Sequence, residues 1–466
     1  MDTTASSAYV WALHEMGFAD FNDERLNKRI VKIASTLLQH PQNSIPQACK
    51  TWSDTKAVYR FFANNKVNSQ NMLSSHIVET VNRCSSFPTV LVAQDTTTIN
   101  VGDKQISGLG RIDDKNSQGL FIHSGLAMSP TGVPLGIAYQ KTYVRKEETQ
   151  RKGYREKYQL LPIEQKESIR WVETLESVTK TFSGKHIVLI GDRESDIYDV
   201  FQKAQGKVID LLVRTAWNRK ILNSEQQETD NYLFSHAKKG KILVNYKTQI
   251  PIKGSHKTRE TTLVIRANSF TLVAPQKRTG KHPEIPLYIL DVSEENPPEE
   301  EPIHWMLTTT MEVATLDQAI EKVQWYMYRW RIERFHYILK TGAFNIEKLQ
   351  FETFPRFKKA ITMYSIVAWR ILWTTYNFRE HPKDNAESIF SEHEVKTLCL
   401  VEKKVTYTMT VQEAVVAMAK LGGFLARKHD GSPGIKSLWI GFQTLQYMMY
   451  GILMAEKAHF TLSKQQ

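Results

Sequence analysis

TVLVAQDTTTIN, at residues 89–100, is the segment that best predicts the architecture at the centre of this 466-residue chain. Its first half is an apolar, β-branched run typical of a buried strand, and we expect its second half to form a polar loop. A second apolar run at His186–Ile190 leads into GDRESDIYDVFQKA, which is typical of a loop entering a helix. An acid follows each run, Asp95 in the first segment and Asp192 in the second. Acids at the ends of neighbouring strands converge on one edge of an α/β sheet, where ligands usually bind.

Further strands are expected on both sides of these two segments, and a helix is expected from Glu164 to about Thr179. Between Tyr232 and Leu290, short alternating runs predict antiparallel strands and no convincing helix. Apolar or alternating patterns predict the remaining strands at residues 119–129, 132–144, 211–217 and 304–310.

Both ends of the chain are predicted to be helical. Apolar residues recur at helical spacing near the N-terminus, and Ser53 and Asp54 could cap a second helix there. From Leu316 onward almost every segment has a helical pattern. We therefore expect three domains: a helical domain at 1–70, an α/β domain at 71–370 with a β insertion at about 215–302, and a helical domain at 371–466.

The composition is that of an ordinary globular protein with a basic excess. Hydrophobic residues make up 41% and charged residues 24%, and 61 Lys and Arg against 49 Asp and Glu give a net charge of +12. This balance excludes disordered, collagenous and disulfide-scaffold chains. The positive charge favours a polyanionic partner, although it does not choose between nucleic acid and a membrane surface.

The sequence does not predict a membrane protein. The longest charge-free stretch, residues 116–140, is interrupted by Gly and Pro residues, and the N-terminus does not resemble a secretory signal. Cys49, Cys84 and Cys399 are odd in number and lack metal-ligand spacing, so we expect reduced thiols in the cytoplasm. The motifs of nucleotide-binding loops, zinc sites and nucleophile elbows are missing from the sequence.

YMYRWRIERFHYILKTGA, at residues 326–343, carries the strongest single signal for chemistry. If it forms one helix, Tyr326, Arg329, Glu333 and Lys340 share about 60° of one face. An acid between two bases and a phenol suits a metal-binding carboxylate next to phosphate clamps. The alternative is a solvated charged face or an intrahelical series of ion pairs. His336 adjoins this stripe, and a packing or hydrogen-bonding role is the simpler interpretation for it.

Asp95 and Asp192 also have simpler interpretations. Asp192 could cap the helix that follows it, and Asp95 could be a turn residue. Three nearby acids compete with Asp192 for the same role, namely Glu194, Asp196 and Asp199. If the carboxylates do converge, hard oxygen ligands of this kind suit Mg²⁺ or Mn²⁺ and phosphoryl transfer.

A basic segment lies within the predicted β insertion. Residues 238–281 carry eleven Lys or Arg residues and one acid, Glu260. Such a surface can neutralise several phosphates, so DNA binding would weaken with added salt. The alternative is a soluble β surface whose edge is protected by lysine.

At this point the residues resemble a known family, the bacterial cut-and-paste DDE transposases of the insertion-sequence-four group, and within it the transposon-five type. The signature is Tyr326-x2-Arg329-x3-Glu333-x6-Lys340. Further segments resemble the family in the same order: AVYRFF at 57–62, VAQDTTTI at 92–99, KESIRW at 166–171, IGDRESDI at 190–197, ENPP at 295–298 and KLGGFLARK at 420–428. The resemblance covers nearly the whole chain.

This resemblance implies a ribonuclease-H-like catalytic core, flanked by helical N- and C-terminal domains, with an antiparallel β subdomain inserted before the glutamate helix. It implies that Asp95, Asp192 and Glu333 form a metal triad that holds two Mg²⁺ ions, with Mn²⁺ as a substitute. It also implies excision through a hairpin on the transposon end, followed by joining of the 3′-hydroxyl ends to target DNA.

The resemblance further implies contacts with double-stranded DNA. Tyr326, Arg329 and Lys340 would hold a phosphate near the 5′ end, and Arg214 matches a DNA contact of the family. Trp305 matches a residue that stacks on a flipped thymine, a role that an indole face suits. The N-terminal domain would bind the terminal inverted repeats, and the C-terminal helices would form a homodimer.

Two alternative functions remain open on the sequence. A domesticated or decayed relative would bind DNA without cleaving it, and a related nuclease would cleave without joining strands. In each case we expect a cytoplasmic, nucleoid-associated bacterial protein with no membrane partner.

Overall fold

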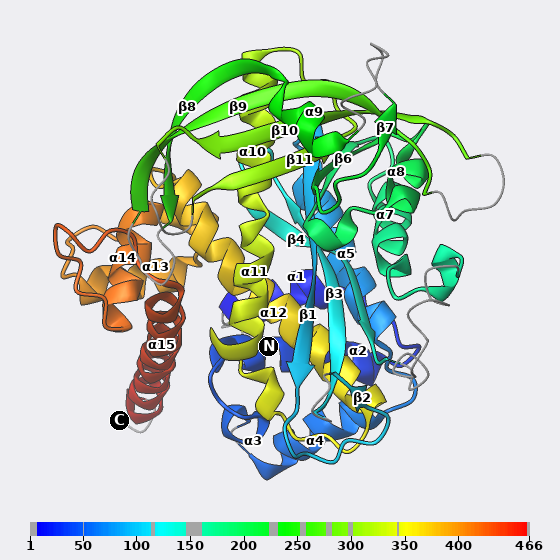
Figure 1. Ribbon diagram of the computed structural model, residues 1–466. Helices are drawn as coiled ribbons and strands as arrows, with labels where there is room; N and C mark the ends of the chain where they lie inside the picture. Colours follow the sequence, from blue (N-terminus) through cyan, green and yellow to red (C-terminus); the bar gives the residue numbers. More distant parts are fainter. Residues whose placement is uncertain are drawn as a thin grey trace.

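The computed structural model describes residues 7–49, 51–112, 117–145, 161–222, 232–251, 258–275, 282–296, 302–342 and 344–463. The chain is a mixed α/β structure with one large sheet and helical flanks (Figure 1). Its helices are α1 (Ser7–Met16), α2 (Glu24–Gln39), α3 (Ile45–Ala48), α4 (Trp52–Ala63), α5 (Ser69–Cys84), α7 (Ile169–Thr181), α8 (Tyr198–Ala204), α9 (Leu233–Lys238), α10 (Leu316–Tyr328), α11 (Trp330–Tyr337), α12 (Phe354–Glu380), α13 (Glu392–Val401), α14 (Val411–Leu421) and α15 (Ile435–Ser463). Its strands are β1 (Thr89–Asn100), β2 (Gly110–Arg111), β3 (Gln118–Met128), β4 (Pro134–Tyr143), β5 (His186–Gly191), β6 (Ile209–Arg214), β7 (Ile221–Leu222), β8 (Lys241–Pro251), β9 (Thr258–Leu272), β10 (Ile285–Glu294) and β11 (His304–Thr309).

The central strands lie in the order β4-β3-β1-β5-β6. β3 pairs antiparallel with both β4 and β1, whereas β5 pairs parallel with β1 and β6. The apolar runs of β1 and β5 are fully buried, because helices cover both faces of this part of the sheet. This arrangement fits the ribonuclease-H-like core that the resemblance implies.

The polar half of residues 89–100 is a strand, so the prediction of a loop there is wrong. β1 continues to Asn100 because its whole second half pairs with β3, from Asp95 opposite Ser124 to Asn100 opposite Gly119. Three successive threonines also favour extended structure, since their branched side chains fit a pleated surface. Asp95 is therefore held within a strand and is not a turn residue.

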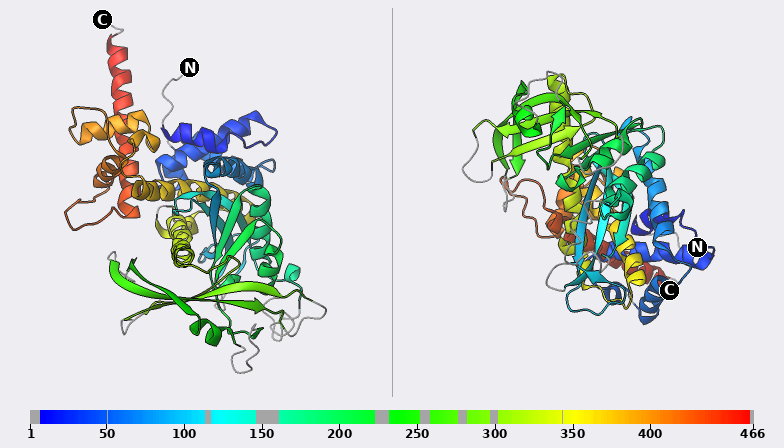
Figure 2. Two further views of the ribbon diagram at one scale, coloured as in Figure 1. Left: turned by 90° about the horizontal axis from the view of Figure 1, so that it is seen from above. Right: turned by 45° about the vertical axis from the view of Figure 1, so that its right-hand side comes forward.

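The predicted β insertion extends the core sheet instead of forming a separate one. β11 pairs antiparallel with β6, and β10, β9 and then β8 or β7 follow outward. Figure 2 shows these long, curved strands on the opposite side of the molecule from the N-terminal helices. The prediction that this region lacks a helix is wrong, because α9 packs against β9 and β10 there.

The N-terminal helices form an amphipathic group, as the sequence predicts. Ile30, Ile33 and Leu37 of α2 are buried on one face. The cap of α4 was assigned to the wrong residues, because Thr51 and not Ser53 or Asp54 accepts the hydrogen bond that begins the helix.

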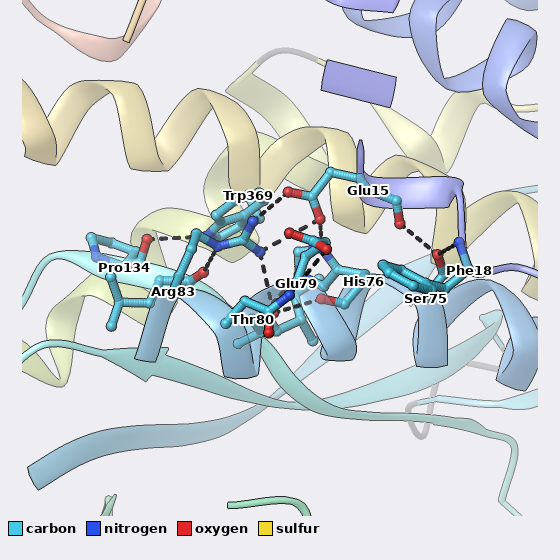
Figure 3. Close-up of polar contacts among 12 residues, drawn as sticks. Glu15, Phe18, Ser75, His76, Glu79, Thr80, Arg83, Pro134 and Trp369 are labelled. Carbon is cyan, nitrogen blue, oxygen red and sulfur yellow. Dashed lines mark hydrogen bonds and ion pairs between the residues drawn. The ribbon is translucent and has the colours of Figure 1, made fainter. Parts of the chain in front are cut away.

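A buried polar network joins these helices to the core sheet (Figure 3). Glu15 at the end of α1 accepts a hydrogen bond of 2.6 Å from Nη1 of Arg83 on α5, and its other oxygen lies 2.7 Å from Nδ1 of His76. The Arg83 guanidinium lies 4.2 Å from the ring centroid of Trp369 on α12, whose indole donates to the backbone of Pro134 in β4. One network thus connects α1, α5, α12 and β4.

The signature segment is not one continuous helix. α10 ends at Tyr328, α11 begins at Trp330, and residues 338–342 form a π-helical turn. After α11, the long helix α12 leads into the C-terminal helices. Among the described residues, no helix is long and apolar enough to cross a membrane.

Candidate active site

Three elements bring the predicted acidic triad together. The parallel pairing of β1 and β5 ends at Ala93 opposite Ile190, and Asp95 and Asp192 each lie two residues beyond this last pair. Glu333 comes from α11, which packs against β1 beside the same edge of the sheet (Figure 1). All three carboxylates are half-buried.

Asp95 lies near enough to each of the other two carboxylates for its charge to raise their pKa. The pKa of Asp192 is raised by burial and next by the negative charge of Asp95. The pKa of Glu333 is also raised by burial; Arg329 opposes this shift, and Asp95 adds to it. Asp95 thus interacts with both partners, and the cluster concentrates negative charge in a partly dehydrated site.

The acids that compete with Asp192 have other partners. Glu194 forms an ion pair of 2.6 Å with Arg170, which also donates to Thr96 of β1 at 2.9 Å. Asp196 is buried, pairs with Arg219 at 2.6 Å and accepts a backbone hydrogen bond from Ala216. Asp199 is buried within α8.

Asp192 caps a helix, which is one of the two roles considered for it. One oxygen, Oδ1, accepts a hydrogen bond of 2.9 Å from the backbone of Glu194 and so begins the short 3₁₀ helix Arg193–Ser195. Within the described residues, no hydrogen bond or ion pair engages its other oxygen, Oδ2.

The four residues expected to share one helix face, Tyr326, Arg329, Glu333 and Lys340, are divided between α10, its C-cap, α11 and the π-helical turn. Arg329 donates to Glu333, the intrahelical ion pair considered as an alternative. Tyr326 is buried, burial raises its pKa, and its ring forms an edge-to-face contact with Trp305 at a centroid distance of 5.6 Å. Lys340 lies in the π-helical turn, outside α11, and pairs with Glu347 at 3.6 Å.

Two further residues lie near the carboxylates. His336 is buried with Nδ1 3.5 Å from Asp95, so it contacts the site through a position that the sequence did not favour. Arg214 ends β6 and donates a long hydrogen bond of 3.4 Å to the backbone of His304. It also lies close enough to Tyr326 for its positive charge to oppose the rise in the pKa of the phenol.

Arg170 is a residue of this site that the sequence reasoning did not single out. Its guanidinium joins Thr96, next to Asp95, to Glu194, near Asp192. The only signal in the sequence was its place in the KESIRW segment.

The donor chemistry of the three acids fits a divalent cation. Carboxylate oxygens are the ligands that Mg²⁺ prefers, and the raised pKa values reflect negative charge that a cation would neutralise. Within the described residues, no three acidic, histidine or cysteine side chains already have the spacing of metal ligands. Glu333 would have to exchange its contact with Arg329 for one with the ion.

The basic segment is less uniformly positive than its composition suggests. Arg259 forms an ion pair of 2.7 Å with Glu294, and Arg266 lies 3.8 Å from Asp291. Both acids belong to β10, which pairs with β9. Lys253, Lys257, Lys277, Arg278 and Lys281, together with Pro297 and Pro298 of ENPP, lie outside the described residues.

Comparison with known protein families gives three matches in chain order. Residues 8–67 match the family Transposase DNA-binding, residues 164–370 the Transposase DDE domain, and residues 366–461 the Transposase Tn5 dimerisation domain. The second match includes Asp192 and Glu333 and begins after Asp95. The matched regions are thus similar to a DNA-binding domain, a DDE domain and a dimerisation domain of transposases.

Among solved structures, the cryo-EM structure of the piggyBac transposase synaptic complex with hairpin DNA is similar at 8% identity and a TM-score of 0.35. The match covers 67% of this chain and 52% of the piggyBac chain, so the chain spans about half the length of that protein. The likeness is too weak to carry an argument. The three domain matches, in contrast, make the chain similar, region by region and in chain order, to a transposase DNA-binding domain, a transposase DDE domain and a Tn5 dimerisation domain.

Proposed function

We propose that this protein is a cut-and-paste DNA transposase of the insertion-sequence-four group. It binds the terminal inverted repeats of its element, cleaves each end through a hairpin intermediate and joins the 3′-hydroxyl ends to target DNA. The observation that carries the proposal is the convergence of Asp95, Asp192 and Glu333 from β1, the end of β5 and α11. The order of the domain matches supports the same assignment.

Asp95, Asp192 and Glu333 would hold two Mg²⁺ ions, for which Mn²⁺ can substitute. When bound, these ions supply Lewis-acid activation of water or of a 3′-hydroxyl and stabilise the leaving oxygen. Arg170 keeps the two strand ends in register by joining Thr96 to Glu194. Arg329 holds the Glu333 carboxylate through an intrahelical hydrogen bond.

The remaining predicted residues position DNA around this cluster. Arg329 and Tyr326 hold a phosphate near the 5′ end, and Lys340 joins them after leaving Glu347. Trp305 presents its half-buried indole to a flipped base while its edge contact with Tyr326 fixes the ring. Arg214 neutralises a further phosphate.

The flanking helices complete the assembly in this proposal. The helical domain at residues 1–70 binds the terminal repeats, and the C-terminal helices from residue 371 hold two copies in one synaptic complex. We propose that the protein acts on the bacterial chromosome in the nucleoid.

The test is Mg²⁺-dependent cleavage of a DNA fragment that carries the terminal repeats of the element. Wild type should produce a nick and then a hairpin, and Glu333→Gln should reduce cleavage at least a thousandfold with binding within twofold. Glu321→Gln is the control, because it removes a partly exposed carboxylate of α10 whose ion pair, within the described residues, is with Lys322. A target plasmid in the same reaction reports strand joining.

Each outcome separates the candidate functions. Binding without cleavage by wild type would favour a DNA-binding relative, and cleavage without joined products would favour a nuclease. Cleavage by Glu333→Gln at the wild-type rate would contradict the triad.

A further inference from the structure

A surface recess lies where the parallel core meets the inserted strands. Arg193 follows β5, Arg214 ends β6, Phe234 and Lys238 belong to α9, and His304 begins β11; all five line this recess. Its volume is about 270 Å³, and it is partly open to solvent. Ligand sites typically occupy roughly 300–1,000 Å³, so this recess is at the small end and can admit a sugar-phosphate unit but not a double helix.

Three cationic side chains line the recess, and none of them pairs with an acid among the residues that the structure describes. Arg193 and Lys238 are exposed and Arg214 is half-buried, and none of the three forms an ion pair within the described part of the chain. Other arginines nearby differ in this respect, since Arg170 and Arg219 each pair with a carboxylate at 2.6 Å.

Three acids near the recess form ion pairs or hydrogen bonds with other side chains. Glu194 and Asp196 hold Arg170 and Arg219. Asp291 accepts a hydrogen bond of 2.6 Å from the imidazole of His304. Among the described residues, three cations without a carboxylate partner therefore line one concavity, and two of them are arginines, whose planar forks suit phosphate oxygens.

The recess adjoins the acidic cluster but opens on another face of the sheet. Arg193 directly follows Asp192, so their Cα atoms are about 3.8 Å apart. On β11, His304 and Met306 line the recess, whereas Trp305 between them packs against Tyr326 on α10. Side chains alternate along a strand, so the recess and the indole lie on opposite faces.

We propose that this recess binds a backbone phosphate of the DNA strand that leaves the acidic cluster around the edge of the sheet. The inference rests on the proposed transposase function and adds a phosphate site that includes Arg193 and Lys238. Phe234, half-buried beside the cations, offers an apolar wall to the sugar of the same nucleotide. The ligand class is thus a sugar-phosphate unit of single-stranded or distorted DNA.

The first test compares Lys238→Ala with Lys239→Ala. Both lysines are exposed at the end of α9, and only Lys238 lines the recess. Binding of a duplex with the terminal repeats is measured over a series of KCl concentrations. Lys238→Ala should weaken binding roughly fivefold to tenfold and reduce the slope of log affinity against log salt by about one, with Lys239→Ala equal to wild type.

The second test locates the phosphate. A neutral methylphosphonate replaces each phosphate near the cleavage position in turn. At one position the methylphosphonate should reduce the DNA affinity of wild type by the same factor as the Lys238→Ala substitution does on unmodified DNA. The affinity of Lys238→Ala should not fall further at that position. Equal salt slopes for all three proteins, or additive losses at every position, would overturn the proposal.

These tests remain separate from the test of catalysis. If wild type binds but does not cleave in Mg²⁺, the proposed function fails, while the salt slopes still report on the recess. If wild type cleaves and Lys238→Ala binds with an unchanged slope, the recess proposal alone fails.

Discussion

The charged form of Asp192 is unfavourable for folding. Burial and the nearby charge of Asp95 both raise its pKa. In the folded chain the ionised form of this carboxylate is therefore less stable than in water, and a bound cation would offset that cost. Burial also raises the pKa of Glu333, and the positive charge of Arg329 partly opposes this shift. Clusters of this kind are common at catalytic sites, where function is maintained at a cost in stability.

We therefore expect Asp192→Asn to separate stability from activity. The amide keeps an oxygen for the backbone of Glu194 but removes the repulsion with Asp95. In EDTA its melting temperature should rise by roughly one to a few degrees. In Mg²⁺ its cleavage should fall at least a thousandfold, with DNA binding nearly intact. Thermal melts and cleavage assays on one preparation check both, and full activity would contradict a catalytic role for Asp192.

Trp305 should act after the first nick. We expect Trp305→Ala to nick at the wild-type rate and to form hairpins roughly tenfold more slowly, because stacking of one base on an aromatic ring contributes about 1–3 kcal/mol. Time courses on end-labelled DNA resolve the two steps.

Trp305→Phe is the matched control, since it keeps an aromatic face and much of the contact with Tyr326. A hairpin rate for Trp305→Ala equal to that of wild type would reject the stacking role.

The contact between α5 and β4 depends on one glycine. A Cβ atom at Gly136 would lie 2.0 Å from Oγ1 and 2.6 Å from Cβ of Thr80, far inside van der Waals contact. Because Thr80 is fully buried and donates to the backbone of His76, it cannot rotate away without loss. The helix can approach the strand this closely only because residue 136 has no side chain.

Gly136→Ala should thus destabilise the protein by about 1–3 kcal/mol, the usual cost of overpacking. Urea denaturation gives the change. Gly434→Ala is the control, because no atom lies within 4 Å of its added Cβ, and we expect a change within about 0.5 kcal/mol. Equal midpoints for the two variants would show that α5 and β4 can separate freely.

Across the whole molecule, the Glu15 network couples the N-terminal helices to the catalytic core (Figure 3). His76 is fully buried, its Nε2 accepts a hydrogen bond of 2.9 Å from the backbone of Ile137, and its Nδ1 therefore donates to Glu15. The imidazole must be neutral to make both contacts. Burial lowers the pKa of His76, with Glu15 opposing the shift. Burial by itself would raise the pKa of Glu15, but His76 and Arg83 lower it overall.

The lowered pKa values of His76 and Glu15 both predict that the folded protein loses stability in acid. Below pH 6.5, the ordinary value for histidine, the unfolded chain takes up a proton that folded His76 resists, so stability falls as the pH falls. The loss from His76 can reach about 1.4 kcal/mol per pH unit. Glu15 adds to it below pH 4.5. Urea midpoints between pH 7.5 and 5.5 should decline less for His76→Gln than for wild type.

His123, which is also buried with a lowered pKa, contributes equally to both proteins and so cancels in the comparison. An identical decline in wild type and His76→Gln would show that His76 does not resist protonation.

Much of the architecture could be predicted because its signals are local. The apolar runs before Asp95 and Asp192, the strand pair at residues 119–144 and the amphipathic α2 all follow from the periodicity of burial. The sequence placed the two aspartates at the ends of neighbouring strands, and in the structure both lie two residues beyond the last pair of β1 and β5, although β1 itself continues past Asp95 to Asn100. The predicted roles of these residues, and of Glu333, stay predictions until cleavage is measured.

The errors share one cause, which is dependence on partners distant in the chain. The threonines after Asp95 form a strand because β3 lies beside them, and α9 forms because β9 and β10 bury one of its faces. The break after Tyr328 and the π-helical turn at residues 338–342 interrupt a pattern that looks continuous in the sequence.

The amino-acid sequence thus established the class of fold, the acidic residues and the basic character of this protein, since short-range patterns of polarity encode them. The tertiary structure established which groups are free and which are already paired. Arg259 and Arg266 meet carboxylates of β10, whereas Arg193 and Lys238 meet none in the described chain and face one recess. Charge and hydrogen bonding act through space, so folding alone decides which opposite charges come within a few ångströms.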